Sequence, residues 1–180
     1  YKHGKLKADE TVLIHGGAGA VGAFAIQFAK VTGAKVLATS AAEDMDYVKS
    51  LGADEVIDFR TQDFEKVFNH VDLVLALVGG NTEEKSYNIL RKGGRLVSTV
   101  GLSHQEIAES KDIKAIPMVI EQSGHDLNLI TSLINDEKVK TDVGLTLPLA
   151  NAADAWKALS GDKSIQHPSH GKIVLEVVKM

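Results

Sequence analysis

Residues 11–22 carry the sequence Thr-Val-Leu-Ile-His-Gly-Gly-Ala-Gly-Ala-Val-Gly. The apolar start of this stretch, from Val12 to Ile14, predicts a short buried strand. The glycines that follow satisfy the pattern G-x-G-x-x-G, and a helical pattern begins directly after them. A strand that turns through such a loop into a helix points the helix N-terminus at a pyrophosphate. We therefore predict a dinucleotide-binding turn made by Gly17, Ala18, Gly19, Ala20, Val21 and Gly22.

The residues beyond the glycines have the spacing of a helix that packs on a strand. Val21, Phe24, Ala25 and Phe28 recur at helical intervals, and Gly33 is a suitable C-terminal stop. In such a turn the first glycine permits the tight bend, the second lets the backbone approach the diphosphate, and the third allows close packing. The alternative is a glycine-rich turn with a structural role only, in another α/β protein.

Strand and helix patterns alternate along the first part of the chain. Strands are predicted over residues 12–14, 36–39, 55–58, 71–78 and 95–100. Helices are predicted between them, over residues 43–51, 62–69 and 82–90. The nearly continuous apolar run of the fourth strand is typical of the centre of a parallel sheet. This alternation predicts an α/β fold with a doubly wound parallel sheet, the Rossmann architecture.

Beyond Gly101 the pattern becomes less regular. Residues 102–113 predict a loop with a short helical piece. A sixth strand is predicted over residues 115–121, where Pro117 indicates a strand start, an edge or a bulge. One apolar face over residues 127–134 predicts another helix.

Residues 139–180 do not fit a further strand–helix unit. They predict an extended segment at 143–149, a helix at 151–159, a polar loop at 161–170 and a strand at 171–178. We therefore divide the chain into a dinucleotide-binding domain at residues 1–138 and a separate C-terminal segment at residues 139–180.

The composition excludes several classes of function. With 180 residues and 44% hydrophobic content, the chain can form one domain, or slightly more, around a real core. The absence of cysteine excludes a disulfide framework and a thiolate metal site, and it is compatible with a cytoplasmic protein. A net charge of -4 without a basic cluster argues against nucleic acid or an anionic membrane as partner. We also find no apolar run long enough to span a membrane.

The end of the second predicted strand bears on the choice of cofactor. An acid there would hold the ribose hydroxyls of NAD, but this strand ends in Thr39, Ser40 and Ala41. Small residues leave room for a 2′-phosphate, so NADP(H) is favoured and NAD(H) is the alternative. Against this, Glu43 and Asp44 follow closely, and no lysine or arginine stands beside them to pair with a phosphate.

The carboxyl ends of the fourth and fifth predicted strands face the same crevice in this architecture. Small residues there would let the nicotinamide half of the cofactor lie against the backbone. The candidates are Val78, Gly79, Gly80, Thr99, Val100 and Gly101. The alternative for Gly79 and Gly80 is a simple turn before the next helix.

Other candidate residues carry weaker signals. His167 and His170 have the spacing H-x-x-H, but no third ligand is in sight and we predict no metal site. His15 borders the glycine turn, and we interpret it as a hydrogen-bonded structural residue rather than a catalytic one. We identify no nucleophile elbow and no phosphate-transfer loop, and we name no catalytic residue.

Several segments together resemble the medium-chain dehydrogenase/reductase superfamily, and more narrowly its zinc-independent quinone oxidoreductase (zeta-crystallin-like) branch. They occur in the order of that family and span most of the chain. The segments are His15–Gly22, Ala25–Lys30, Ser50–Asp58, Val78–Gly80, Gly93–Val97 and Gly171–Leu175.

The resemblance implies NADPH-dependent reduction of a quinone or another conjugated carbonyl, without a metal. By similarity, Gly19 to Gly22 would hold the pyrophosphate, and Thr39 to Ala41 would border the adenosine ribose and its phosphate. Phe59 would pack near the adenosine, while Gly80 and residues 99–101 would line the nicotinamide side. The alternatives are a dinucleotide-binding module without turnover, a relative of zinc-type alcohol dehydrogenases and, more remotely, a methyltransferase.

The chain also departs from the family. Ala76 stands where the family often has an acid, and Asp44 stands where it often has a basic residue. The N-terminal GroES-like catalytic domain of the family, about a hundred residues, is absent, so the chain by itself is expected to be inactive. Residues from 139 onward would be the last part of that domain. Their exposed apolar face, formed by Ile173, Leu175 and Val177, would favour a homodimer or aggregation.

Overall fold

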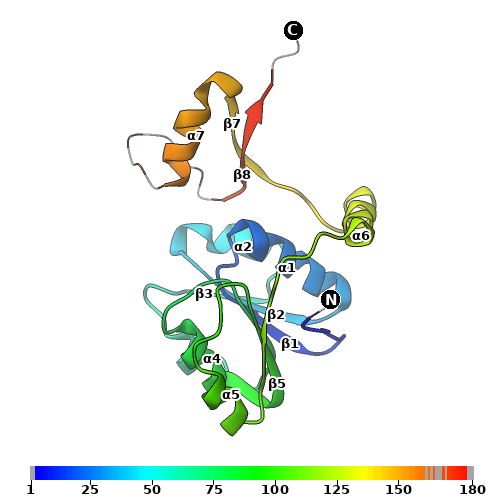
Figure 1. Ribbon diagram of the computed structural model, residues 1–180, viewed down its shortest axis with the longest axis vertical. Helices are drawn as coiled ribbons and strands as arrows, with labels where there is room; N and C mark the ends of the chain where they lie inside the picture. Colours follow the sequence, from blue (N-terminus) through cyan, green and yellow to red (C-terminus); the bar gives the residue numbers. More distant parts are fainter. Residues whose placement is uncertain (1–2, 161, 163, 165–167, 169, 178–180) are drawn as a thin grey trace.

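The computed structural model describes residues 3–160, 162, 164, 168 and 170–177 (Figure 1). Its main sheet has six strands in the order β3-β2-β1-β4-β5-β6, and each neighbouring pair is parallel. This order, with crossover helices between the strands, confirms the predicted Rossmann architecture. The strands are β1 (Thr11–Ile14), β2 (Lys35–Ser40), β3 (Glu55–Asp58), β4 (Val71–Ala76), β5 (Leu90–Ser98) and β6 (Lys114–Pro117).

Helices cover both faces of this sheet. Figure 1 shows α1 and α2 on one side and α4 and α5 on the other. The helices of this unit are α1 (Ala20–Thr32), η1 (Ala42–Asp44), α2 (Met45–Ser50), α3 (Phe64–Val67), α4 (Thr82–Ile89), α5 (Gln105–Ser110) and α6 (Gly124–Asn135).

The core lies in two layers, one on each face of the sheet. Val12 and Ile14 of β1 pack with Ile26 of α1, whereas Leu13 packs into the other layer with Tyr87 of α4. Successive residues of a strand point to opposite faces, so a strand covered on both faces must be apolar at every position. This is why the predicted β1 appears in the sequence as an unbroken apolar run.

A smaller C-terminal unit follows the sheet. It contains β7 (Val143–Pro148), η2 (Leu149–Asn151), α7 (Ala152–Leu159) and β8 (Lys172–Glu176), with β7 and β8 parallel. In Figure 1 it lies beyond the six-stranded sheet, next to the side of α2. Gln27 of α1 ties the connecting segment to the main unit, because its amide oxygen accepts from the Lys140 backbone N–H at 2.7 Å. Its amide nitrogen donates to the Lys140 carbonyl oxygen at 3.1 Å.

Several predicted boundaries were wrong. β5 begins at Leu90 rather than Arg95, because Leu90 pairs with Val71 before an irregularity in the register. The helix predicted at 62–69 is only α3, and β4 ends at Ala76. β6 ends at Pro117 rather than continuing to 121, and it lies at the sheet edge as the proline indicated. The polar loop at 161–170 and the end of the strand predicted at 171–178 lie partly outside the described residues.

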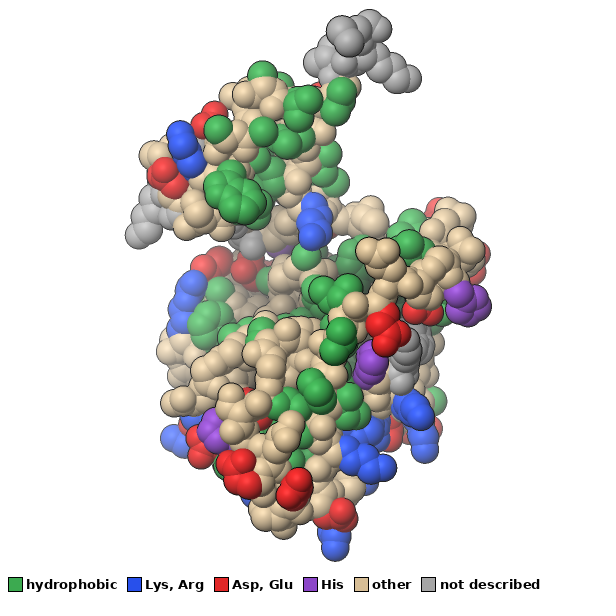
Figure 2. All heavy atoms as spheres, in the orientation of Figure 1, with side chains coloured by type: hydrophobic (Ala, Val, Ile, Leu, Met, Phe, Trp, Pro, Cys, Tyr) green, Lys and Arg blue, Asp and Glu red, His purple; other side chains and the backbone are tan. Residues whose placement is uncertain are grey.

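The exposed apolar surface of the C-terminal unit differs from the prediction. Ile173 and Leu175 are half-buried, whereas Val174 is exposed and Val177 is 68% exposed. Alternate residues of a strand point to opposite faces. The more exposed face of β8 is therefore the one that carries Val174, not the one that carries Ile173 and Leu175. Figure 2 shows hydrophobic side chains gathered on this unit. The exposed large ones include Val143, Leu149, Trp156, Leu159, Val174 and Val177.

No helix within the described part of the chain is both long and apolar enough to span a membrane.

Candidate functional site

The glycine turn between β1 and α1 is fixed by backbone contacts. Gly16 has φ +69°, and the N–H of Gly17 donates to the Thr39 carbonyl of β2 at 2.8 Å. The N–H of Gly19 then donates to the Gly16 carbonyl at 3.1 Å. A Cβ atom at Gly22 would stand 2.2 Å from the Gly16 carbonyl oxygen, which no side chain tolerates. The third glycine of the motif is therefore required by close packing of α1 against the turn.

The N-terminus of α1 is open to a ligand. Its N-cap is Gly19, which offers no side-chain cap, and the first turn contains no acidic residue. Helical N–H groups at such an end lack partners inside the helix, and the helix dipole adds positive potential. The side chain of Val21 is 55% exposed beside them. This end of α1 thus has the chemistry of an anion-binding site.

His15, the last residue before the turn, is hydrogen-bonded to β2 and to α4. Its Nε2 lies 3.1 Å from Ser86 Oγ, and its Nδ1 lies 3.3 Å from Thr39 Oγ1. Ser86 Oγ donates to the Thr82 carbonyl, so it accepts from His15 Nε2–H, and Nδ1 is left to accept from Thr39. Burial lowers the pKa of His15 from 6.5 to about 4. The ring is therefore neutral and hydrogen-bonded at both nitrogens, as expected for a structural residue.

A first cavity, of about 550 Å³, opens at the carboxyl ends of β1 to β4. Phe59 and Val78 line it, and they are 58% and 45% exposed although both are large and apolar. Ser40 and Ala41 do not line it, because both are buried and the Ser40 hydroxyl donates to the Ala41 carbonyl at 3.0 Å. The other lining residues include His15, Gly16, Thr39, Arg60, Asn81, Thr82 and Lys85.

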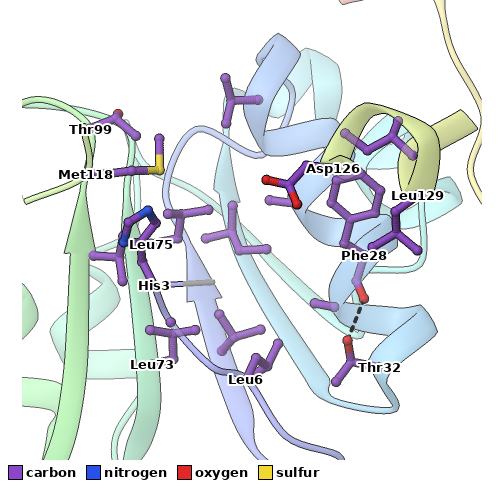
Figure 3. Close-up of a pocket in the computed structure, with 18 of the residues that line it drawn as sticks. His3, Leu6, Phe28, Thr32, Leu73, Leu75, Thr99, Met118, Asp126 and Leu129 are labelled. Carbon is purple, nitrogen blue, oxygen red and sulfur yellow. Dashed lines mark hydrogen bonds between the residues drawn. The ribbon is translucent and has the colours of Figure 1, made fainter. Parts of the chain in front are cut away.

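A second cavity, of about 320 Å³, lies on the α1 side of the sheet (Figure 3). Thr99 and Met118 lie together at one side of it, and Phe28 and Leu129 lie across from them. Its walls are mostly apolar side chains of β1, β4, β5, α1 and α6. Val21 lines this cavity and Gly16 lines the first, so the glycine turn stands between the two.

The loop after β5 is held by a buried carboxylate that the sequence analysis missed. Glu83 of α4 accepts the backbone N–H groups of Ser103 at 2.9 Å and His104 at 3.1 Å, and the Tyr87 hydroxyl at 2.9 Å. Burial alone would raise the pKa of Glu83, but these three donors outweigh it and lower the pKa. No sequence pattern marks Glu83, because it looks like an ordinary acid in a helical first turn.

The remaining predicted residues lie around the carboxyl edge of the sheet and line neither cavity. Gly79 and Gly80 are exposed, and a Cβ atom at either would meet nothing within 4 Å. Val100 and Gly101 form a turn around Ser98, whose hydroxyl accepts from the Val100 N–H and donates to the Gly101 carbonyl. Thr99 is the member of that stretch which reaches the second cavity.

The described residues do not fit a zinc centre. The chain has no cysteine, and no group of three or more histidine or acidic side chains among the described residues is placed to hold a metal. His170 instead lies 2.7 Å from an Asp142 carboxylate oxygen and stacks on Tyr47, with ring centroids 3.8 Å apart. His167 lies outside the described residues.

Comparison with known proteins identifies the group to which this architecture is similar. The model of the zinc-binding dehydrogenase family matches residues 51–175. A chloroplast envelope quinone oxidoreductase homolog of Arabidopsis thaliana is 31% identical, over 95% of this chain and 55% of that protein. An NADPH-dependent alkenal/one oxidoreductase of the same plant is 30% identical, over 95% of this chain and 42% of that protein.

The solved structures agree. The structure of the quinone oxidoreductase from Coxiella burnetii superimposes with a TM-score of 0.85 at 28% identity, covering 97% of this chain and 55% of that one. The chain spans about half the length of the curated relatives it matches.

Proposed function

Because the chain belongs to the zinc-binding dehydrogenase family, within the medium-chain dehydrogenase/reductase superfamily, we propose that it is the cofactor-binding part of an NAD(P)H-dependent oxidoreductase. The observation that carries this proposal is the close contact of Gly22 with the Gly16 carbonyl in front of the uncapped α1. That geometry leaves a row of free N–H groups at the point where a diphosphate would sit.

The two cavities on either side of this turn suit the two halves of a dinucleotide. The first is lined by Phe59 and Val78, exposed apolar side chains that an adenine ring can contact. The second begins at Val21 and Thr99, where the nicotinamide half would lie. The nicotinamide half would be bordered by residues at the same edge of the sheet, namely Gly79, Gly80, Val100 and Gly101.

We favour NADP(H) over NAD(H). Residues at the end of β2 carry no carboxylate to hold both ribose hydroxyls, since the strand ends in Thr39, Ser40 and Ala41. Of these three residues Thr39 lines the first cavity, so a 2′-phosphate near the end of β2 would meet no carboxylate of that strand. The plant relative whose name includes NADPH and an alkenal/one substrate supports the same choice.

Within the full-length protein, we propose reduction of a quinone or a conjugated carbonyl, as the names of the relatives suggest. The reduced nicotinamide supplies the hydride for this chemistry. This chain holds the diphosphate, orients the two halves of the cofactor and provides apolar walls that exclude water. A binding module without turnover is the competing function.

We assign residues 1–138 to the dinucleotide-binding domain and 139–180 to the end of a GroES-like domain. We propose a homodimer without a bound metal, supported by the exposed apolar side chains of the C-terminal unit. A cytoplasmic location remains a prediction, and the names of relatives include chloroplastic and mitochondrial forms.

Turnover by the full-length protein tests the proposal. We expect oxidation of NADPH, followed by its absorbance, when a quinone or an enone is added. Tight NADPH binding without reduction of any quinone or enone would instead support the binding module.

A further inference from the structure

Arg60 and Glu43 form an ion pair that the sequence did not suggest. Arg60 Nη1 donates to both carboxylate oxygens of Glu43, at 3.0 and 2.9 Å. The two side chains are 55% and 53% exposed, and the guanidinium carbon lies 5.5 Å from the centre of the Phe59 ring. Exposed ion pairs contribute little to folding stability, so stability alone does not account for this arrangement.

The pair lies at the carboxyl ends of β2 and β3, beside the candidate site. Ser40 and Asp58 are paired across these strands, and the Phe59 N–H donates to the Ser40 carbonyl at 3.1 Å. The Asp58 carboxylate accepts the backbone N–H of Arg60 at 3.0 Å, which fixes the start of the turn. The first cavity is lined by Gly16, Thr39, Phe59 and Arg60, together with the residues named above.

The other cation that lines this cavity, Lys85, belongs to α4 rather than to the ends of β2 and β3, and it is paired as well. Lys85 Nζ lies 3.4 Å from an Asp63 oxygen and 3.3 Å from a Glu65 oxygen. Arg60 is therefore the lining cation next to the end of β2, where the second ribose of a dinucleotide would lie. Both hydrogen bonds to Glu43 come from Arg60 Nη1, and neither comes from Nη2 or Nε.

We propose that Arg60 binds the 2′-phosphate of NADPH and that Glu43 competes with this phosphate for the guanidinium, so that the pair sets the preference between NADPH and NADH. The inference rests on the proposed function. A phosphate carries more charge than a carboxylate and offers a guanidinium paired acceptors, so it can displace Glu43. Glu43 is on the surface, where its side chain can rotate away.

The charge of Glu43 makes this competition costly for NADPH. Its own backbone N–H and the Arg60 guanidinium hold the pKa of Glu43 below its ordinary value, so the carboxylate is ionised at neutral pH. NADH brings no phosphate and leaves the pair intact. The pair therefore weakens NADPH binding without abolishing it, and removing Glu43 relieves the competition.

Calorimetric titration of four forms of the protein with NADPH and NADH tests the inference. The forms are the unaltered protein, Arg60→Gln, Glu43→Gln and the control Lys35→Gln. The control breaks an exposed ion pair between the same two strands at their opposite ends, since Lys35 Nζ lies 2.6 Å from a Glu55 oxygen. Circular dichroism of each form establishes that it is folded.

We expect Arg60→Gln to lower NADPH affinity by about 10- to 100-fold and to leave NADH affinity unchanged. Glu43→Gln should raise NADPH affinity by about 2- to 5-fold. The control should change neither. An unchanged ratio of the two affinities in Arg60→Gln, or in Glu43→Gln, would overturn the inference while the proposed function stands. Binding of neither nucleotide by the unaltered protein would overturn both.

Discussion

His15 Nε2 lies 3.1 Å from Ser86 Oγ, so the last residue before the glycine turn is joined to α4, the helix that follows β4. Thr39 holds the other ring nitrogen and also accepts the Gly16 N–H at 3.2 Å. The ring thereby connects β1, β2 and α4 under the proposed cofactor site. Nδ1 accepts a hydrogen bond from Thr39, which a protonated ring could not do. The arrangement therefore depends on the ring being neutral.

This dependence predicts a loss of stability in mild acid. The pKa of His15 is about 4 in the folded protein and 6.5 ordinarily, so the unfolded chain binds a proton first as the pH falls. The neutral His15 contributes fully to the free energy of unfolding above pH 6.5. As the pH falls from 6.5 to about 4, the free energy of unfolding decreases by roughly 3 kcal/mol in all. His15→Gln keeps a donor and an acceptor but cannot titrate, so we expect a flatter pH profile in urea unfolding.

His125→Gln is the matched control for this experiment, because His125 is exposed on α6. Its pH profile should match that of the unaltered protein. A His15→Gln variant whose profile remains as steep as that of the unaltered protein would show that His15 is not the titrating group.

Gly22→Ala should damage both the fold and the site. The new Cβ atom would stand 2.2 Å from the Gly16 carbonyl oxygen, so α1 or the turn must move. We expect a loss of about 2–4 kcal/mol in unfolding free energy and no detectable NADPH binding. Gly124→Ala is the control, since its Cβ atom meets nothing within 4 Å at the start of α6, and it should be neutral or slightly stabilising. Equal behaviour of the two variants would contradict the packing argument.

Glu83→Gln should loosen the loop after β5. With the amide oxygen at the Oε1 position, the amide nitrogen would take the place of Oε2 and present an N–H group to the Ser103 N–H, which Oε2 now accepts at 2.9 Å. We expect a loss of about 2 kcal/mol in urea unfolding and faster amide hydrogen exchange at residues 99–104. Glu84→Gln, at the exposed neighbouring position, should leave both unchanged. Slow exchange retained in Glu83→Gln would rule out this role for the carboxylate.

The parts of the fold that depend on local pattern were predictable from the sequence. Val12 to Ile14 and the glycines after them indicate a strand, a turn and a helix because their neighbours in sequence are also their neighbours in space. The start of β5 was not predictable, because Arg91, Lys92 and Gly93 break the strand pattern there. Pairing with β4, which only the folded sheet provides, defines that part of the strand.

The candidate site shows the same difference between local patterns, which the sequence reveals, and contacts that only the folded chain makes. Phe59 and Thr99 were predicted, and the structure places each at a cavity. The ion pair between Arg60 and Glu43 and the bonds of Glu83 to Ser103 and His104 join residues distant in sequence. No spacing rule connects such residues, so these contacts emerged only from the way the strands and α4 meet.

The most direct test of the account is a calorimetric titration of the protein and its Gly22→Ala variant with NADPH and NADH. The account predicts saturable binding to one site, tighter for NADPH than for NADH, and its loss in the variant. Binding of neither nucleotide by the unaltered protein, or equal binding by the variant, would contradict a cofactor site at the glycine turn.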